Sequence, residues 1–134
     1  MAMLEEELNS QGTEEMKWEG DGWYLVQRGS YTMGGLGEMK GIGIWYWDFA
    51  DKKIKNIWVD TMGTMAMGSS KYNEMTGVWH MKSKGRGPWG SSTGAGTMKF
   101  TDDDTMEWTW TEWDGLKLVK TMEMMGVSHR KAAP

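Results

Sequence analysis

The stretch from Gly41 to Met67 constrains the fold of this chain more than any other part of it. Two runs rich in aromatic and β-branched residues, 41–49 and 54–67, flank a short polar segment at 50–53. This arrangement is typical of a β-hairpin, and both runs are too short and too β-branched to favour helices. The stretch therefore predicts an all-β fold built around this hairpin.

Similar short runs follow one another along the rest of the chain. We expect strands at 13–19, 23–31, 40–49, 53–60, 65–72, 78–82, 95–101, 105–113 and 116–127, separated by turn signals such as Gly20-Asp21-Gly22. Eight or nine short strands without a convincing helix indicate an antiparallel up-and-down meander. A barrel or half-barrel is favoured over a sandwich, because nearly every connection is a tight turn and closure removes exposed sheet edges.

Length and composition bound the domain organisation and the partners. The 134 residues suit one domain, with an acidic arm at 1–12 and a β domain at 13–131. A net charge of −4 argues against a nucleic-acid surface, and the absence of Cys excludes disulfides and thiolate metal sites. The chain shows neither a secretory signal nor an apolar run near the ~20 residues that a membrane helix needs. We therefore expect a cytoplasmic protein with no membrane partner.

One segment resembles a known family. The run Trp-Val-Asp-Thr-Met at 58–62, after the Lys-rich turn near residue 52, is similar to the Trp-Ile/Val-Asp-Ser-Met segment of an uncharacterised bacterial domain-of-unknown-function family. The turns at 72–77 and 102–107 also resemble that family. The resemblance covers about residues 13–131 and implies a lipocalin-like (calycin-like) barrel, but no catalytic residue. Family members usually begin with an extra Gly-x-Trp strand, which this chain lacks.

Two motif matches fall in the Gly/Ser-rich segment 83–94. Residues 85–90 match G-x-G-x-x-G and residues 90–94 match G-x-S-x-G, but neither is followed by the helix that its chemistry requires. We interpret the segment as a mobile flap at the barrel mouth, with Arg86 and Trp89 as candidate lid residues.

Metal and cofactor binding are not favoured. Met62, Met65 and Met67 lie close together, and His80 precedes Met81, so thioether and imidazole ligands for Cu(I) are available. Methionines are nevertheless scattered over nearly every expected strand, as expected if they fill an irregular interior. We expect no metal and no cofactor.

The candidate binding site is the barrel interior. Alternation along the strands indicates that Trp108 and Trp110 share one face, with Glu107 on the other. Asp60 shares the face of Trp58. The expected ligand-binding residues are Trp47, Trp58, Asp60, Met62, Met65, Met67, Met98, Trp108, Trp110 and Met122.

Three classes of function remain open at this point. The preferred one is a barrel that binds a small apolar or aromatic ligand. The second is an enzyme that uses Asp60 or His80 as an acid or base in the same pocket. The third is a structural or interaction protein whose interior is filled by its own side chains, since a barrel of about eight strands has room for either side chains or one ligand.

A homo-oligomer, most simply a dimer, is also expected. Residues 44–49 are apolar on both faces, and Trp23, Tyr24, Trp79 and Met125 are expected to extend an outer apolar patch. A barrel that lacks one strand also leaves an edge that invites pairing with another chain. The alternative is that residues 1–12 fold back and cover this edge.

Overall fold

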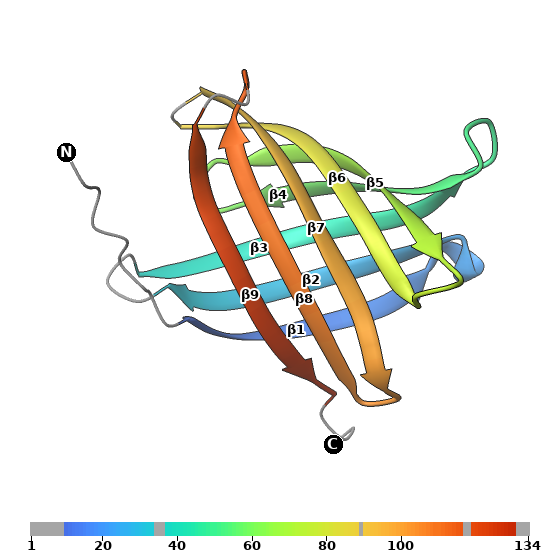
Figure 1. Ribbon diagram of the computed structural model, residues 1–134. Coiled ribbons are helices and arrows are strands. Elements are labelled where there is room, and N and C mark those ends of the chain that lie inside the picture. The colour runs from blue at the N-terminus through green and yellow to red at the C-terminus, as the bar shows by residue number, and fades with distance from the viewer. Residues whose placement is uncertain (1–9, 34–36, 89, 117–118, 131–134) are drawn as a thin grey trace.

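The computed structural model is one sheet of nine antiparallel strands, each hydrogen-bonded to its neighbours in the chain (Figure 1). It describes residues 10–33, 37–88, 90–116 and 119–130. A 3-10 helix, η1 (Gly20–Gly22), connects the first two strands. The strands are β1 (Ser10–Glu19), β2 (Tyr24–Met33), β3 (Glu38–Asp48), β4 (Lys53–Asp60), β5 (Met65–Asn73), β6 (Val78–Gly87), β7 (Gly90–Asp102), β8 (Thr105–Asp114) and β9 (Lys120–His129).

The sheet curls through 242° and forms a half-barrel. β1 and β9 each pair with one neighbouring strand, so both are edges of the sheet. The predicted all-β, up-and-down meander is confirmed, and the structure selects the half-barrel. In the part of the chain that is described, no helix is long and apolar enough to cross a membrane.

Side-chain oxygens organise several of the hairpin turns. The carboxylate of Asp48 accepts hydrogen bonds from the backbone N–H groups of Ala50 (2.9 Å) and Asp51 (3.0 Å) at the end of β3. The amide oxygen of Asn73 does the same for Met75 and Thr76, and Gly77 then adopts a φ of +72°. Asp and Asn favour such turns because their side-chain oxygens can accept hydrogen bonds from backbone N–H groups that have no backbone acceptor.

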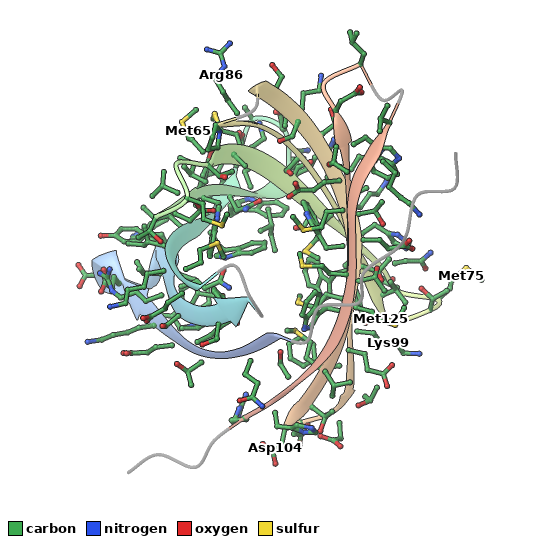
Figure 2. All side chains as sticks on the ribbon, turned by 90° about the vertical axis from the view of Figure 1, so that its left-hand side faces the viewer. Met65, Met75, Arg86, Lys99, Asp104 and Met125 are labelled. Carbon is green, nitrogen blue, oxygen red and sulfur yellow. The ribbon has the colours of Figure 1, made fainter. Side chains whose placement is uncertain are left out.

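Alternation and register divide the side chains between two faces. Figure 2 shows Met65, Arg86 and Lys99 on the outer side of the curled sheet. Successive residues of a strand point to opposite faces, and directly paired residues share a face. Ala66 and its partner Trp58 therefore lie on the concave face, as does the Met98–Trp108 pair.

The half-barrel has almost no enclosed core. Among the described residues, Val26 is the one buried hydrophobic side chain, with 5% of its surface exposed, and the register places it with Ile44 on the outer face. A sheet that curls through only part of a circle buries one face partially, and side chains on its concave face remain open to solvent. The interior is a trough rather than a filled barrel.

The segment 83–94 is not a flap. β6 continues to Gly87 and β7 begins at Gly90, so most of this segment is paired strand. Its glycines are needed where the sheet curls: a Cβ on Gly85 would lie 3.0 Å from the Cβ of Ala66. The arm predicted at 1–12 falls mostly outside the described residues, and β1 includes its last three positions.

Candidate functional site

Aromatic rings and glycines together line the concave face. The ring of Trp58 lies over Gly41 and Gly43 of the adjacent strand, and the ring of Trp110 lies over Gly94 and Gly96. Any Cβ at these glycines would crowd the ring that covers it. The glycines therefore let the indoles lie against the sheet instead of projecting across the trough.

The same arrangement recurs near both edges of the sheet. Trp108 of β8 covers Gly126 of β9, where a Cβ would lie 2.5 Å from the ring atom Cζ2. Tyr31 of β2 covers Gly12 of β1 and Gly29 of its own strand. The concave face consequently presents flat aromatic surfaces along much of its width, which suit apolar or aromatic ligands.

The indole N–H groups of Trp58 and Trp110 are hydrogen-bonded within the protein. Trp58 Nε1 donates to Asp60 Oδ2 (2.9 Å), and Trp110 Nε1 donates to Glu112 Oε1 (3.0 Å). In both cases the acceptor is two residues further along the same strand, on the same face. These bonds hold the rings in one orientation and leave their faces, rather than their N–H groups, for a ligand.

Asp60 has a structural role at the end of β4. Besides the Trp58 indole, its carboxylate accepts hydrogen bonds from the backbone N–H groups of Met62 (2.9 Å) and Thr64 (3.1 Å). Its backbone N–H also donates to the Thr64 carbonyl (3.1 Å), which closes the turn before β5. The carboxylate connects this turn to the concave ring of Trp58.

Tyr31 and Glu14 form a polar pair near the β1 edge. The Tyr31 hydroxyl donates to the Glu14 carboxylate, and both side chains lie on the concave face. Burial, and then the bond to Glu14, raises the pKa of Tyr31 well above its usual value near 10. The Tyr31 side chain at this end of the trough is therefore held in its neutral phenol form.

Ser70 is the unusual polar residue of the concave face. Only 6% of its surface is exposed, and its hydroxyl has no hydrogen-bond partner in the described structure. It lies on β5 between Ile54 of β4 and Met81 of β6, in a row that continues to Gly96 and Trp110. A buried hydroxyl without a partner costs free energy, so Ser70 lowers the stability of the ligand-free fold.

The charges of the concave face have one sign. Within the described strands, no Lys, Arg or His side chain lies on this face, according to the register of the sheet. Its acidic residues are Glu14, Asp60, Glu112 and Asp114. Over the described strands, the concave face therefore attracts cations and repels anions.

The residues expected to bind a ligand fall in two places. The concave face carries seven of them, namely Trp47, Trp58, Asp60, Met98, Trp108, Trp110 and Met122. Met62 lies in the turn after β4. Met65 and Met67 instead lie on the outer face, paired with Val59 and Ile57. The four-residue turn between β4 and β5 sets this parity, which the local sequence does not specify.

The remaining candidates lie elsewhere. Arg86 is exposed on the outer face of β6, and Trp89 is outside the described residues. Trp79, expected in an outer patch, lies on the concave face, with its ring 5.0 Å from that of Tyr72. His80 is exposed on the outer face, so it cannot share a pocket with Asp60.

Several concave residues were not among the expected ligand-binding residues, although alternation already indicated that Met106 shares the face of Trp108 and Trp110. They are Tyr31, Trp45, Trp79, Met81, Met106 and Met124. The available signal was the spacing of glycines, because Gly41 and Gly43 have the same parity as Trp45 and Trp47. A strand on which glycines and indoles share the same alternate positions predicts a face where rings lie against the backbone.

A second hollow lies on the outer face. It is a groove of about 640 Å³ that crosses the sheet from Tyr46 of β3 to Trp113 of β8. Its larger lining side chains include Lys55, Lys82 and Lys84, which the register places on the outer face. The groove is therefore separate from the concave trough.

Neither a metal centre nor a known relative supplies a function for these surfaces. No group of three His, Cys, Asp or Glu side chains suited to a metal ion occurs in the described part of the chain. No family model, no curated protein and no solved structure matches this chain.

Proposed function

We propose that this chain is a binding protein for a small apolar or aromatic molecule, which lies in the concave trough of the half-barrel. The observation that supports this most is the packing of Trp58 and Trp110 over glycines, which leaves aromatic faces at the surface of an open trough. Burying such faces against a ligand would contribute about 25 cal/mol per Å² of apolar surface removed from water.

Polar groups would orient the ligand. The carboxylates of Glu14, Glu112 and Asp114 lie on the same concave face as the rings of Trp58 and Trp110. Glu112 accepts one hydrogen bond, from Trp110, and sits in a trough that carries no basic side chain among the described residues. A mainly apolar ligand with one polar or cationic group fits this combination.

The two other functions have less support. Asp60 already accepts three hydrogen bonds, so its carboxylate is committed to the β4–β5 turn, and His80 lies on the opposite face. A structural protein with a filled interior would bury many apolar side chains on the concave face, whereas none of those described there is buried.

Native mass spectrometry and a matched pair of tryptophan variants test the proposal. We expect a retained small molecule, or binding of a neutral aromatic probe such as 1-naphthol. Trp47→Leu in the trough should weaken binding several-fold, since an aromatic contact contributes about 0.5–1.5 kcal/mol. Trp23→Leu is the control, because Trp23 lies next to η1. The two residues are comparably exposed, Trp47 at 47% and Trp23 at 66%. Equal effects of the two variants, or no binding by the wild type, would contradict the proposal.

We also propose that the chain is a divergent member of the bacterial family that it resembles. The segment 58–62 supports this, because its Trp and Asp form a bonded pair and its Asp organises the turn that follows. A structure of a family member should show the same indole–carboxylate–turn arrangement. A different role for its Trp and Asp would refute the assignment.

We propose, in addition, a homodimer that forms through β9. β1 is protected as an edge by the charges of Glu14, Glu15 and Lys17, whereas β9 carries only Glu123 between its ends. Met125 and Val127 of β9 are exposed on the outer side, at 79% and 55%. Antiparallel pairing of β9 with β9 of a second copy would satisfy the free backbone groups of both edges and bury these side chains.

A further inference from the structure

Part of the outer face also carries charged side chains of one sign. From β4 to β6, and on β7 as far as Phe100, no Asp or Glu side chain lies on the outer face of the described strands. Basic residues are concentrated there instead. They are Lys53, Lys55, Lys71, His80, Lys82, Lys84, Arg86 and Lys99.

β6 contributes the densest part of this basic surface. His80, Lys82, Lys84 and Arg86 alternate along the strand, all are exposed, and alternate residues lie about 7 Å apart. The neighbouring outer positions on β5 and β7 are neutral near Lys82 and Lys84, namely Ser69, Met67, Ala95 and Thr93. No carboxylate therefore compensates these two ammonium groups from either adjacent strand.

The groove on this face concentrates the uncompensated charge. It passes between Lys82 and Lys84 and is bounded by the aromatic side chains of Tyr46 and Trp113. Lys55 also lines it, but its ammonium group is held by Asp48 (2.8 Å) and Asp51, and these bonds raise its pKa. Lys82 and Lys84 have no ion pair in the described structure and are free to meet an external anion.

We propose that this groove is a second binding site, for a small amphipathic organic anion. The acidic group lies between Lys82 and Lys84, and the apolar body extends across Thr93 to the Trp113 side chain. The volume of about 640 Å³ falls within the range typical of small-molecule sites. The site differs from the concave trough in position and in charge preference, so it does not depend on the function proposed above.

A small anion is favoured over a nucleic acid. The net charge of the whole chain is −4, which repels a long polyanion beyond the basic face. The groove ends at aromatic side chains on β3 and β8, whereas a strand of nucleic acid needs a track that continues along the surface.

Calorimetric titration with 2-naphthalenesulfonate tests the proposal, with 2-naphthylmethylammonium, a cation that carries the same ring, as the comparison. At low salt and neutral pH, we expect the sulfonate to bind the groove and the ammonium compound not to bind there. The double variant Lys82→Glu/Lys84→Glu should lower the sulfonate affinity about tenfold, and Lys82→Gln/Lys84→Gln about threefold. Added salt should weaken binding by the wild type, because the charges are exposed.

The matched control is Lys71→Glu/Lys99→Glu. It makes the same change in net charge on the same face, but neither residue lines the groove. We expect it to change the affinity less than threefold. An equal loss in both double variants would show a general charge effect and overturn the site. Loss of sulfonate binding in Trp47→Leu, but not in the lysine variants, would place the anion in the trough. Tighter, length-dependent binding of a single-stranded oligonucleotide at Lys82 and Lys84 would show a nucleic-acid surface instead.

Discussion

The indole of Trp58 occupies the space that a Cβ on Gly41 would need. The two residues lie on adjacent strands, and Gly43, the direct partner of Trp58, is also under the ring. The Asp60 carboxylate fixes this position of the ring through the indole N–H. Within the central hairpin, the two glycines under the ring, the Trp58 indole and the turn-forming carboxylate of Asp60 thus form one packed unit.

Substitution of Gly41 by Ala should destabilise the protein by about 1–3 kcal/mol, because an added methyl group must displace the Trp58 ring. Urea denaturation gives the change in the free energy of unfolding. Gly87→Ala is the control, since the nearest atom to a Cβ there is Thr64 Oγ1, at an ordinary distance of 3.4 Å. In the double variant Gly41→Ala/Trp58→Leu, the cost of the alanine should be smaller than in the wild type. If Gly41→Ala lowered the free energy of unfolding equally in both backgrounds, the added methyl group would not overlap with the Trp58 ring.

Replacing Asp60 with Asn should lower stability by about 1–3 kcal/mol, because an amide cannot accept all three of its hydrogen bonds. Thermal denaturation measures the effect. Glu107→Gln makes the same chemical change at an exposed position on the outer face and should have little effect. If Asp60→Asn left stability unchanged, the structural role of Asp60 would be refuted.

Substitution of Ser70 by Ala should increase stability by about 1 kcal/mol in the absence of ligand, because it removes a buried hydroxyl without a partner. Chemical denaturation of the ligand-free protein measures this gain, and Ser91→Ala, at an exposed position, is the control. A clear loss of stability without ligand would mean that the hydroxyl has a partner within the protein.

The stability of the fold should decrease above about pH 10 in a way that depends on Tyr31. Its pKa is raised in the folded protein, so above pH 10 the unfolded chain loses the phenolic proton while the folded chain keeps it. The contribution is fully present below pH 10 and is lost as the pH rises further. Urea midpoints from pH 8 to pH 11 should therefore decrease less in Tyr31→Phe than in the wild type. Tyr24→Phe is the control, since no bond from its hydroxyl to a carboxylate is present in the described structure; equal slopes in wild type and Tyr31→Phe would contradict the prediction.

Placing a charge on the β9 edge should dissociate the proposed dimer. Sedimentation equilibrium at micromolar concentration should give a dimer for the wild type and a 15.3 kDa monomer for Met125→Lys. Met75→Lys is the matched control, because Met75 is 96% exposed at the β5–β6 turn, away from the edge. A monomeric wild type would refute the dimer.

Much of the fold could be predicted from local features of the sequence. The hairpin around residues 50–53 and the turns at 72–77 and 102–104 depend on residues whose own side chains form the turn, as Asp48 and Asn73 do. The common face of Trp108 and Trp110 follows from alternation within one strand. These properties depend on residues that are neighbours in the chain, so they can be predicted from the local sequence.

Tertiary structure decided which face became the concave one and which residues reached it. Alternation within β5 separates Met65 from Ala66, but the turn that follows Asp60 determines which of them joins Trp58. The glycines of the segment 83–94 suggested a loop. Glycine occurs both in flexible loops and in strands that pack closely against a neighbouring side chain, and the sequence alone does not distinguish the two. Gly94 is needed because the ring of Trp110, from the next strand, lies over it, and that contact exists only once β7 and β8 have paired.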